Sequence, residues 1–354
     1  MAEINFKQFT LNNEGVRDVN EVLFTTAFKQ NSLWNTATMR TGVKDGKALD
    51  YVDNMGIVGQ AGRGCDPEYT NVDILGYEKK WALGDWSIPK KICYDDLKKT
   101  IAEYAMRTGT RAEDIIGTDF YDNILMPLWN KAVTEMYWRM GWFADKAAKN
   151  VGDGGTITAG VNVKHFKMAD GLFKQIFAIA SANSAQHTAI AANREATEAA
   201  QKSAIKVQGA ALAVIDNLMS DADSRIQENG GRLMITNSLY QALRKDYALR
   251  YHETMPFMQM AEGLQIPTYD GVPIVIVSEW DTAIKKYEND GTKLNLPHRA
   301  VFASPKNLFI GTEDTDVFAE LNATFDDVTR ANYFYAASNI GTLVGEDALV
   351  QVAY

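Results

Sequence analysis

Apolar residues recur at three-to-four spacing across one long stretch of the chain. The pattern lies within residues 119–149, and this period is typical of an amphipathic helix. About 25 residues at 1.5 Å per residue make a rod of about 38 Å. Pro127 either kinks this helix or occupies the first turn of its second half. Bulky residues on other faces, Trp138 and Trp142 among them, indicate burial on more than one side.

A different period precedes this helix. Between residues 72 and 93 apolar side chains alternate with polar ones, and Gly76 and Gly84 lie near the turns. This pattern predicts an extended two-stranded hairpin. A lone ribbon is marginally stable in water, so it needs a surface to lie on, in its own subunit or in another. Charged and aromatic side chains mark its tips: Glu78, Lys79, Lys80, Trp81 and Trp86.

The middle of the chain is rich in small residues. A glycine-rich break at 151–160 is a candidate domain boundary. The stretch 171–205 is rich in alanine, which favours helix. We therefore expect one long, polar-faced helix or a helix pair there, and this stretch could be an insertion.

From residue 206 onward, helix and strand patterns alternate. Residues 232–235 predict a short buried strand, after which Thr236 or Asn237 caps a helix. Asp270-Gly271 is a favoured two-residue turn, and it predicts a hairpin over 264–280.

The C-terminal part predicts further strands. Two of them flank Ser304-Pro305. The continuous run from Tyr333 to Ala337 is apolar and aromatic, which fits a strand covered on both faces. A turn is expected at Ile340-Gly341.

Composition narrows the function classes. A chain of 354 residues predicts about two domains. The formal net charge of −9 argues against a dedicated nucleic-acid-binding module, yet it allows a protein that encloses nucleic acid without gripping it. The two cysteines, Cys65 and Cys93, have no metal-binding spacing, and free thiols in a reducing compartment are expected. The sequence has no secretory signal and no apolar run long enough to cross a membrane.

Motifs that carry chemistry are missing from the sequence. It contains no phosphate-binding GxxxxGK[ST], no dinucleotide-binding GxGxxG, no HExxH and no GxSxG. The four histidines lie far apart, and the acidic pairs at 326–327 and 346–347 would point to opposite faces of a strand. We therefore expect no enzyme activity, no metal and no cofactor.

Residues 299–354 resemble the end of the major capsid proteins of tailed bacteriophages of the Hong Kong 97 type. The resemblance rests on Arg330, on the aromatic strand that contains Tyr333 and Tyr335, and on the glycine at Gly341. The order of the predicted elements also agrees with that family. A weak N-terminal segment, a ribbon, a long helix, an α/β region and a strand-rich end follow one another in both.

The resemblance implies an α+β capsid fold with an N-terminal arm, an extended hairpin loop, a long spine helix, and peripheral and axial domains. The implied divisions are an arm at 1–50, an extended loop at 51–93, a peripheral domain with the spine helix at 94–160 and 318–354, and an axial domain at 161–317 that holds the alanine-rich stretch 171–205.

The resemblance also implies a function. The chain would assemble with itself into hexamers and pentamers of an icosahedral phage head, which encloses double-stranded DNA without sequence-specific binding. Portal, scaffolding, and decoration or cement proteins are the implied partners, with the virion capsid as destination and the host cytoplasm as place of assembly. Two alternatives are an encapsulin-type protein nanocompartment and a soluble α/β enzyme with an unrecognised site. The residues expected at assembly contacts are Glu78, Lys79, Lys80, Trp81, Trp86, Trp138, Trp142, Arg330, Tyr333 and Tyr335.

Overall fold

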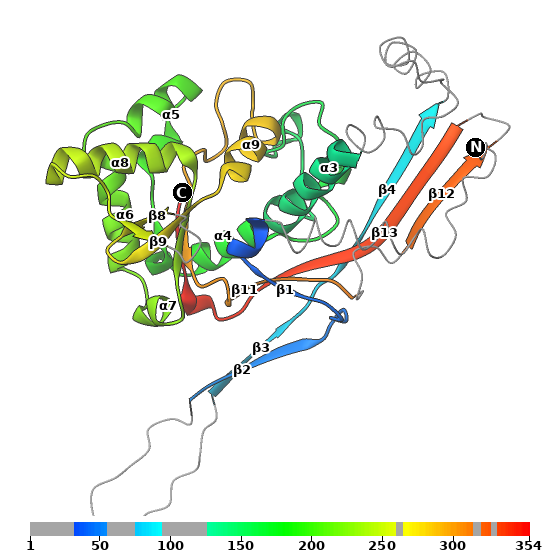
Figure 1. Cartoon of the computed structure of the whole chain (residues 1–354), viewed down its shortest axis with the longest axis horizontal. Helices are drawn as coiled ribbons and strands as arrows, with labels where there is room; N and C mark the ends of the chain where they lie inside the picture. The colour runs from blue at the N-terminus through cyan, green and yellow to red at the C-terminus, as the bar shows by residue number, and fades with distance from the viewer. Residues whose placement is uncertain (1–31, 55–74, 94–125, 260–264, 314–319, 327–330) are drawn as a thin grey trace, which may run out of the picture.

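The computed structural model describes residues 32–54, 75–93, 126–259, 265–313, 320–326 and 331–354. A body of sheets and helices carries a two-stranded ribbon that projects from it (Figure 1). The α-helices of the described residues are α3 (Met126–Trp138), α4 (Leu172–Ala182), α5 (Glu198–Ala204), α6 (Ala210–Ser220), α7 (Ser224–Glu228), α8 (Asn237–Tyr251) and α9 (Ser278–Tyr287). The strands are β1 (Thr38–Arg40), β2 (Ala48–Asn54), β3 (Leu75–Lys80), β4 (Gly84–Cys93), β5 (His187–Thr188), β6 (Arg232–Ile235), β7 (Phe257–Gln259), β8 (Gln265–Tyr269), β9 (Val272–Ile276), β10 (Ala300–Ala303), β11 (Leu308–Gly311), β12 (Glu320–Asp326), β13 (Ala331–Val344) and β14 (Val350–Ala353).

The central strands of the larger sheet are buried on both faces. Its seven strands follow the order β5-β14-β10-β6-β9-β8-β7. Because successive residues of a strand point to opposite faces, Val301 of β10 packs in one core with α4 and α9, while Phe302 packs in the other with α6 and α8. The central strands β10 and β14 are buried throughout, which explains their continuous apolar runs.

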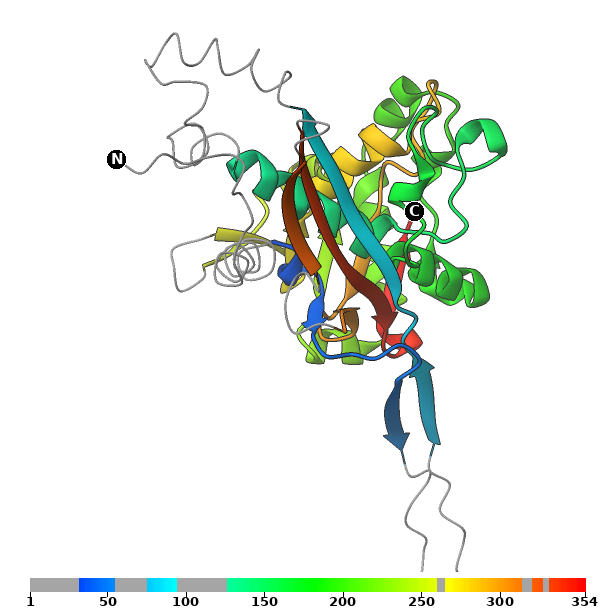
Figure 2. The same ribbon diagram turned by 90° about the vertical axis from the view of Figure 1, so that its right-hand side faces the viewer.

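The second sheet is organised by the long strand β13. Residues 331–340 of this strand pair with β4, and residues 341–344 pair with β11. The short strand β1 runs parallel to β11, and β12 pairs with the first half of β13. Figure 2 shows β4, β13 and β12 side by side along the flank of the body.

The ribbon consists of β2 and β3. The two strands are antiparallel, with Ala48 opposite Lys80 and Asn54 opposite Leu75. Within the described part of the chain, neither strand pairs with any other. Both figures show the ribbon standing away from the sheets and helices of the body.

Helix α3 continues into one π-helical turn at Arg139–Phe143, so the helical stretch ends at Phe143 and not near residue 149. Pro127 is the second described residue of α3. Residues 119–125 of the predicted rod lie outside the described residues.

Helix α3 is tied to α9 by a polar cluster. Glu135 accepts a hydrogen bond from the Tyr287 hydroxyl and one from Lys286 at 3.2 Å. Burial alone would raise the pKa of Glu135, but these hydrogen bonds outweigh it and hold the pKa below its usual range. Arg139 lies 3.7 Å from the same carboxylate and stacks on the Tyr287 ring. These contacts hold helix α3 against helix α9.

Several local predictions are confirmed. The strand at 232–235 is β6, and α8 begins at Asn237 as expected. Thr236 holds the N-cap position without a side-chain capping hydrogen bond, and the Asn237 amide donates instead to Asp281 at 2.7 Å. Asp270 and Gly271 form the turn between β8 and β9, with φ angles of 48° and 76°. These signals depend on a few adjacent residues, which is why the sequence alone predicts them.

The predicted hairpin over 72–93 is wrong. Strand β3 pairs with β2, and β4 pairs with β13 near the other end of the chain. Alternation identified both strands correctly, but it carries no information about the partner of each strand. The ribbon therefore lies earlier in the chain than expected.

Three further expectations need correction. The turn expected at Ile340-Gly341 is absent, because β13 continues to Val344. The stretch 171–205 does hold two helices, α4 and α5, but α4 is not polar-faced, since its Leu172, Phe173 and Ile176 are buried. The segment expected to end the hairpin at residue 280 instead begins helix α9.

We predict that the stability of the fold falls as the pH drops from about 6.5 to about 4. His298 is 1% exposed; its Nε2 lies 3.1 Å from the Gln201 carbonyl oxygen, and its Nδ1 lies 2.8 Å from the Ser238 hydroxyl. Burial lowers the pKa of His298 from 6.5 to about 4. The unfolded chain therefore binds the proton first, which costs about 3 kcal/mol of stability across that window.

Chemical unfolding at a series of pH values checks this expectation. The variant His298→Asn should flatten the decline, whatever its stability at neutral pH. The control His252→Asn, at an exposed position that already has a positive φ angle, should keep the wild-type slope. An unchanged slope in His298→Asn would contradict the assignment.

Candidate assembly interface

The base of the ribbon is anchored by one tryptophan. Trp81 follows β3, is 3% exposed, and packs with Val43 and Phe309. Its amide donates to the Lys47 carbonyl oxygen at 3.1 Å, and its own carbonyl accepts from the Gly46 amide at 2.9 Å. Burying an indole contributes on the order of 4 kcal/mol. The point where the ribbon leaves the body is therefore fixed.

Two glycines make room for Trp81 and Leu83, the residues that follow β3. A Cβ atom on Gly311 would lie 2.5 Å from Cζ3 of Trp81, and one on Gly341 would lie 2.7 Å from Cδ2 of Leu83. Both distances are shorter than side chains tolerate. Glycine in β11 and β13 thus lets the residues after β3 lie directly on the sheet.

Adjacent lysines at the end of β3 have different roles. Lys79 donates to the Val344 carbonyl oxygen at 3.0 Å and forms an ion pair with Asp347. Lys80 lies on the opposite side of the strand, where its only ion pair among the described residues is with Glu78, at 3.3 Å. Lys79 therefore ties the ribbon to the end of β13, whereas Glu78 and Lys80 face outward.

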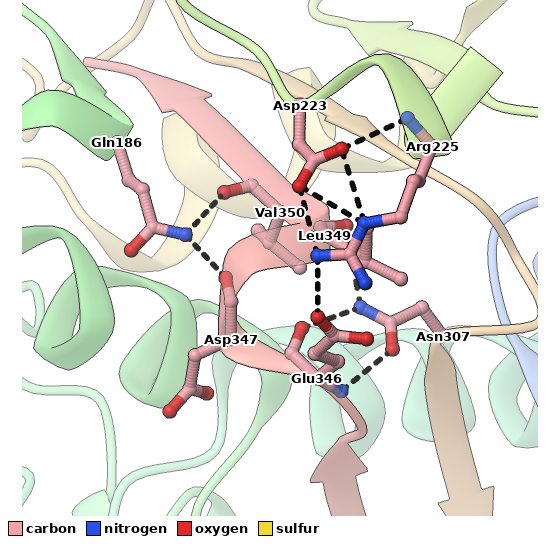
Figure 3. A network of polar contacts seen from close by, with 8 residues as sticks. All are labelled: Gln186, Asp223, Arg225, Asn307, Glu346, Asp347, Leu349 and Val350. Carbon is pink, nitrogen blue, oxygen red and sulfur yellow. Dashed lines mark hydrogen bonds and ion pairs between the residues drawn. The ribbon is translucent and has the colours of Figure 1, made fainter. Parts of the chain in front are cut away.

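The segment that receives Lys79 is itself held in place by side chains. Residues 345–349 connect β13 to β14. Figure 3 shows Asn307, whose amide group donates to the Glu346 carbonyl at 2.9 Å and accepts from the Glu346 amide at 2.8 Å. Gln186 donates to the Val350 carbonyl at 3.2 Å. We call residues 345–349 the joint, because the ribbon, β13 and β14 meet there.

Arg225 of α7 forms an ion pair with the joint through Glu346. Arg225 lies 2.9 Å from Asp223 and 2.7 Å from Glu346 (Figure 3). The hydrogen bond to Asp223 is the largest of the effects that raise the pKa of Arg225, and Glu346 adds to it. The pKa of Asp223 is lowered by the same pair. Charge thus links α7 to the segment that holds the ribbon.

The tryptophans expected at assembly contacts are core residues of this chain. Trp81 and Trp86 are 3% and 6% exposed, and Trp138 and Trp142 are also buried. Trp86 meets the ring of Tyr137 edge-on, with centroids 6.0 Å apart. These four side chains are thus covered within the chain's own core, and their expected place at assembly contacts stays a prediction.

The second half of the predicted set is placed differently. Tyr335 is 41% exposed on β13, so the run from Tyr333 to Ala337 is covered on one face and open on the other, which corrects the expectation of two covered faces. Lys91 of β4 lies opposite Tyr333, with its ammonium 5.4 Å from the ring centroid. We call this open surface of β4 and β13 the flank face. Arg330 lies outside the described residues.

Sequence reasoning missed a second exposed surface. Among the described residues, four of the six exposed large apolar side chains lie between 249 and 259: Leu249, Tyr251, Phe257 and Met258. The strand β7 is exposed at every residue and forms one edge of the larger sheet. An open edge with apolar side chains is suited to contact with another chain. Periodicity could not reveal it, because such residues look like core positions.

The described residues contain no group of three or more His, Cys, Asp or Glu side chains arranged to hold a metal ion. Among the same residues, no helix combines the length and apolar character needed to span a lipid bilayer. The geometry is one of contact surfaces.

Comparison with solved structures identifies the fold. The chain superposes on a satellite phage P4 procapsid structure that includes the size determination (Sid) protein, with a TM-score of 0.52 at 11% identity, covering 96% of this chain and 98% of that one. A structure of Mycobacterium phage Ogopogo gives 0.52 at 9% identity, covering 91% of both chains. One of Gordonia phage Cozz gives 0.51 at 10%, covering 91% and 86%. No protein-family model and no curated protein sequence matches the chain.

The chain has the Hong Kong 97 type capsid fold. Within this capsid fold, we expect the β2–β3 ribbon to serve as the extended loop and α3 with its π-helical turn to serve as the spine helix. The α+β class expected from the sequence is confirmed. The expected arm falls mostly on residues 1–31, which lie outside the described residues.

We predict that Gly311→Ala loosens the extended loop of the capsid fold. The added methyl group must displace the Trp81 indole, which should cost about 1–3 kcal/mol of unfolding free energy. Denaturant unfolding of the soluble subunit measures this loss. Gly152→Ala is the matched control, since a Cβ there meets nothing within 4 Å; an equal loss in both variants would rule out the Trp81 contact as the cause.

A second prediction concerns the tie between the extended loop and the joint. Lys79→Met removes the bonds to Val344 and Asp347 while keeping the length of the side chain. A partly exposed pair contributes less than about 1 kcal/mol, so global stability should barely change. Amide hydrogen exchange of β2 and β3 should rise, whereas Lys80→Met should leave it unchanged. Equal exchange in the two variants would show that Lys79 does not restrain the loop.

Proposed function

We propose that this chain is a capsid subunit that assembles into hexamers and pentamers of an icosahedral phage head enclosing double-stranded DNA. The observation that carries the proposal is the ribbon that projects from a Hong Kong 97 type fold. Among the described residues its strands pair only with each other, and Glu78 and Lys80 face outward along it. A two-stranded ribbon is marginal alone in water. Contact with a neighbouring subunit gives it a surface to lie on.

The flank face of a neighbouring subunit is the surface we assign to the ribbon. It presents Tyr335 together with Lys91, so it combines an apolar ring with positive charge. The ribbon offers Glu78 on its outward side. Aromatic side chains with satisfied charges at the rim are typical of stable interfaces. The contact also explains why an aromatic residue stays exposed on the flank of the isolated subunit.

The exposed residues at 249–259 suit a different contact, between subunits of one ring. In this arrangement, 161–317 acts as the axial domain, and 94–160 with 318–354 acts as the peripheral domain. Strand β14, from the second of these, lies in the larger sheet between β5 and β10. The two domains are thus interlocked, and a ring contact at one end of the body is rigidly connected to the flank face.

The enclosed DNA needs no binding site on the shell. A net charge of −9 keeps the polyanion from adhering to the wall. Portal, scaffolding, and decoration or cement proteins are the further partners of such a subunit, and the role is structural and not catalytic. The place of assembly is the host cytoplasm, and the destination is the virion capsid.

We predict that Tyr335→Thr prevents shell formation without unfolding the subunit. Threonine has a high strand propensity, and Tyr335 is 41% exposed. The unfolding free energy should therefore change by less than about 0.5 kcal/mol. Negative-stain microscopy of the expressed protein, with and without a candidate scaffolding protein, measures the yield of shells. The wild-type chain should form closed shells or tubes, and the variant should remain as small oligomers.

Val207→Thr is the control, because Val207 is the most exposed large apolar residue of the described chain and lies on neither proposed surface. Shell yield should match the wild type in this variant. Wild-type yield in Tyr335→Thr would exclude the flank face as the receiving surface, and failure of the wild-type chain to assemble under any condition would contradict the shell function itself.

A further inference from the structure

A pocket of about 640 Å³ lies between α6, α7, α8 and the turn that joins β8 to β9. Its lining includes three tyrosines and three aspartates: Tyr247, Tyr251, Tyr269, Asp216, Asp223 and Asp270. None of the described residues that line it is a lysine, an arginine or a histidine. The pocket is therefore aromatic on its walls and acidic at its rim.

The three tyrosines are arranged as one aromatic wall. The rings of Tyr247 and Tyr251 lie 4.7 Å apart, and Tyr269 meets Tyr247 edge-on at 6.2 Å. The Tyr269 hydroxyl donates to Asp216. Burial, and after it this hydrogen bond, raise the pKa of Tyr269, so the phenol keeps its proton. The ring faces carry the negative end of a quadrupole, which attracts a cation placed over them.

The carboxylates differ in how far they are already neutralised. Asp223 is paired with Arg225, and Asp216 lies 3.6 Å from Arg250. Asp270 is exposed at the tip of its turn, and the described residues provide no ion pair for it. The pocket thus keeps one carboxylate for a cation that comes from outside.

Arg250 illustrates how this site holds a cation. Its guanidinium group lies 5.5 Å from the centroid of the Tyr251 ring as well as near Asp216. Tyr247 and Asp270 also line the pocket, so an aromatic ring and a carboxylate are both present for a second cation.

We propose that this pocket binds a lysine or arginine side chain presented by a basic segment of a partner protein. Charge complementarity carries the choice of partner, because Arg225 and Arg250 pair two of the three carboxylates of the lining and leave Asp270 for an external cation, and the whole chain has a net charge of −9. The volume of about 640 Å³ holds one long side chain with part of its backbone. The assignment does not depend on the shell function, since it follows from the lining alone.

A binding titration with a defined peptide tests the proposal. The probe is a blocked octapeptide of alternating lysine and glycine, and its counterpart carries glutamine in place of lysine. Calorimetry on the full chain at low ionic strength should detect the lysine peptide and not the glutamine peptide. Absence of binding, or equal binding of the two peptides, overturns the proposal.

Variants at Tyr251 separate the aromatic contribution from the fold. Tyr251 is 46% exposed, so its replacement should leave the subunit folded. Tyr251→Leu should weaken the lysine peptide at least tenfold, because the aliphatic side chain has no quadrupole, whereas Tyr251→Phe should stay within twofold of the wild type. Unchanged affinity in Tyr251→Leu overturns the assignment of the aromatic wall.

Charge-matched variants separate the pocket from the net charge of the chain. Asp270→Asn should weaken binding severalfold, and asparagine tolerates the positive φ angle at this position. Asp85→Asn removes the same charge from an exposed site on β4 and should have no effect. Equal weakening in both variants would mean that the peptide senses only overall charge, and the proposal would fail.

Arginine variants add a readout in the opposite direction. Arg250→Gln removes the cation that lies beside Asp216 and Tyr251, two residues of the lining, so the lysine peptide should bind more tightly, by about threefold or more. Arg244→Gln removes the same charge from an exposed position on the same helix and should leave the affinity unchanged. No gain in Arg250→Gln, or an equal gain in both, counts against a cation site between Tyr251 and Asp216.

Discussion

Backbone hydrogen bonding along β13 connects every part of this subunit. The first ten residues of the strand pair with β4, which follows the ribbon, and the next four pair with β11. Its last carbonyl accepts the hydrogen bond from Lys79, and the joint at 345–349 then leads directly into the larger sheet. The strand β13 is therefore continuous from the flank face to the joint. A displacement at the base of the ribbon is passed through β13 to the flank face and through the joint to the larger sheet.

The sequence predicted the parts of the fold that depend on neighbouring residues. The turn at Asp270-Gly271 requires only the chemistry of two consecutive positions. The partner of β4 depends on a strand near the opposite end of the chain, and alternation within β4 is the same whether it pairs with β3 or with β13. Strand identity could therefore be predicted, while strand pairing could not, except through the resemblance to a known fold.

The same limit applies to the candidate contact surfaces. Trp86 and Tyr335 both lie in strands, and each is a large aromatic residue. Only the three-dimensional arrangement decides that Trp86 faces Tyr137 in the core and that Tyr335 faces outward. Neighbouring charges were equally ambiguous, because Lys79 is engaged at the joint while Lys80 is exposed. A pattern of residue types identifies which side chains matter, but it does not say toward which molecule they point.

The isolation of the ribbon strands has a consequence for how such subunits diverge. Since β2 and β3 pair only with each other among the described residues, residue pairs can be gained or lost beyond Lys79 without disturbing a contact of the body. Each added pair extends the reach of the ribbon by about 3.3 Å, and additions in twos keep the same side chains facing outward. The reach of the ribbon can thus change in small steps while the anchoring tryptophan and the sheets behind it stay as they are.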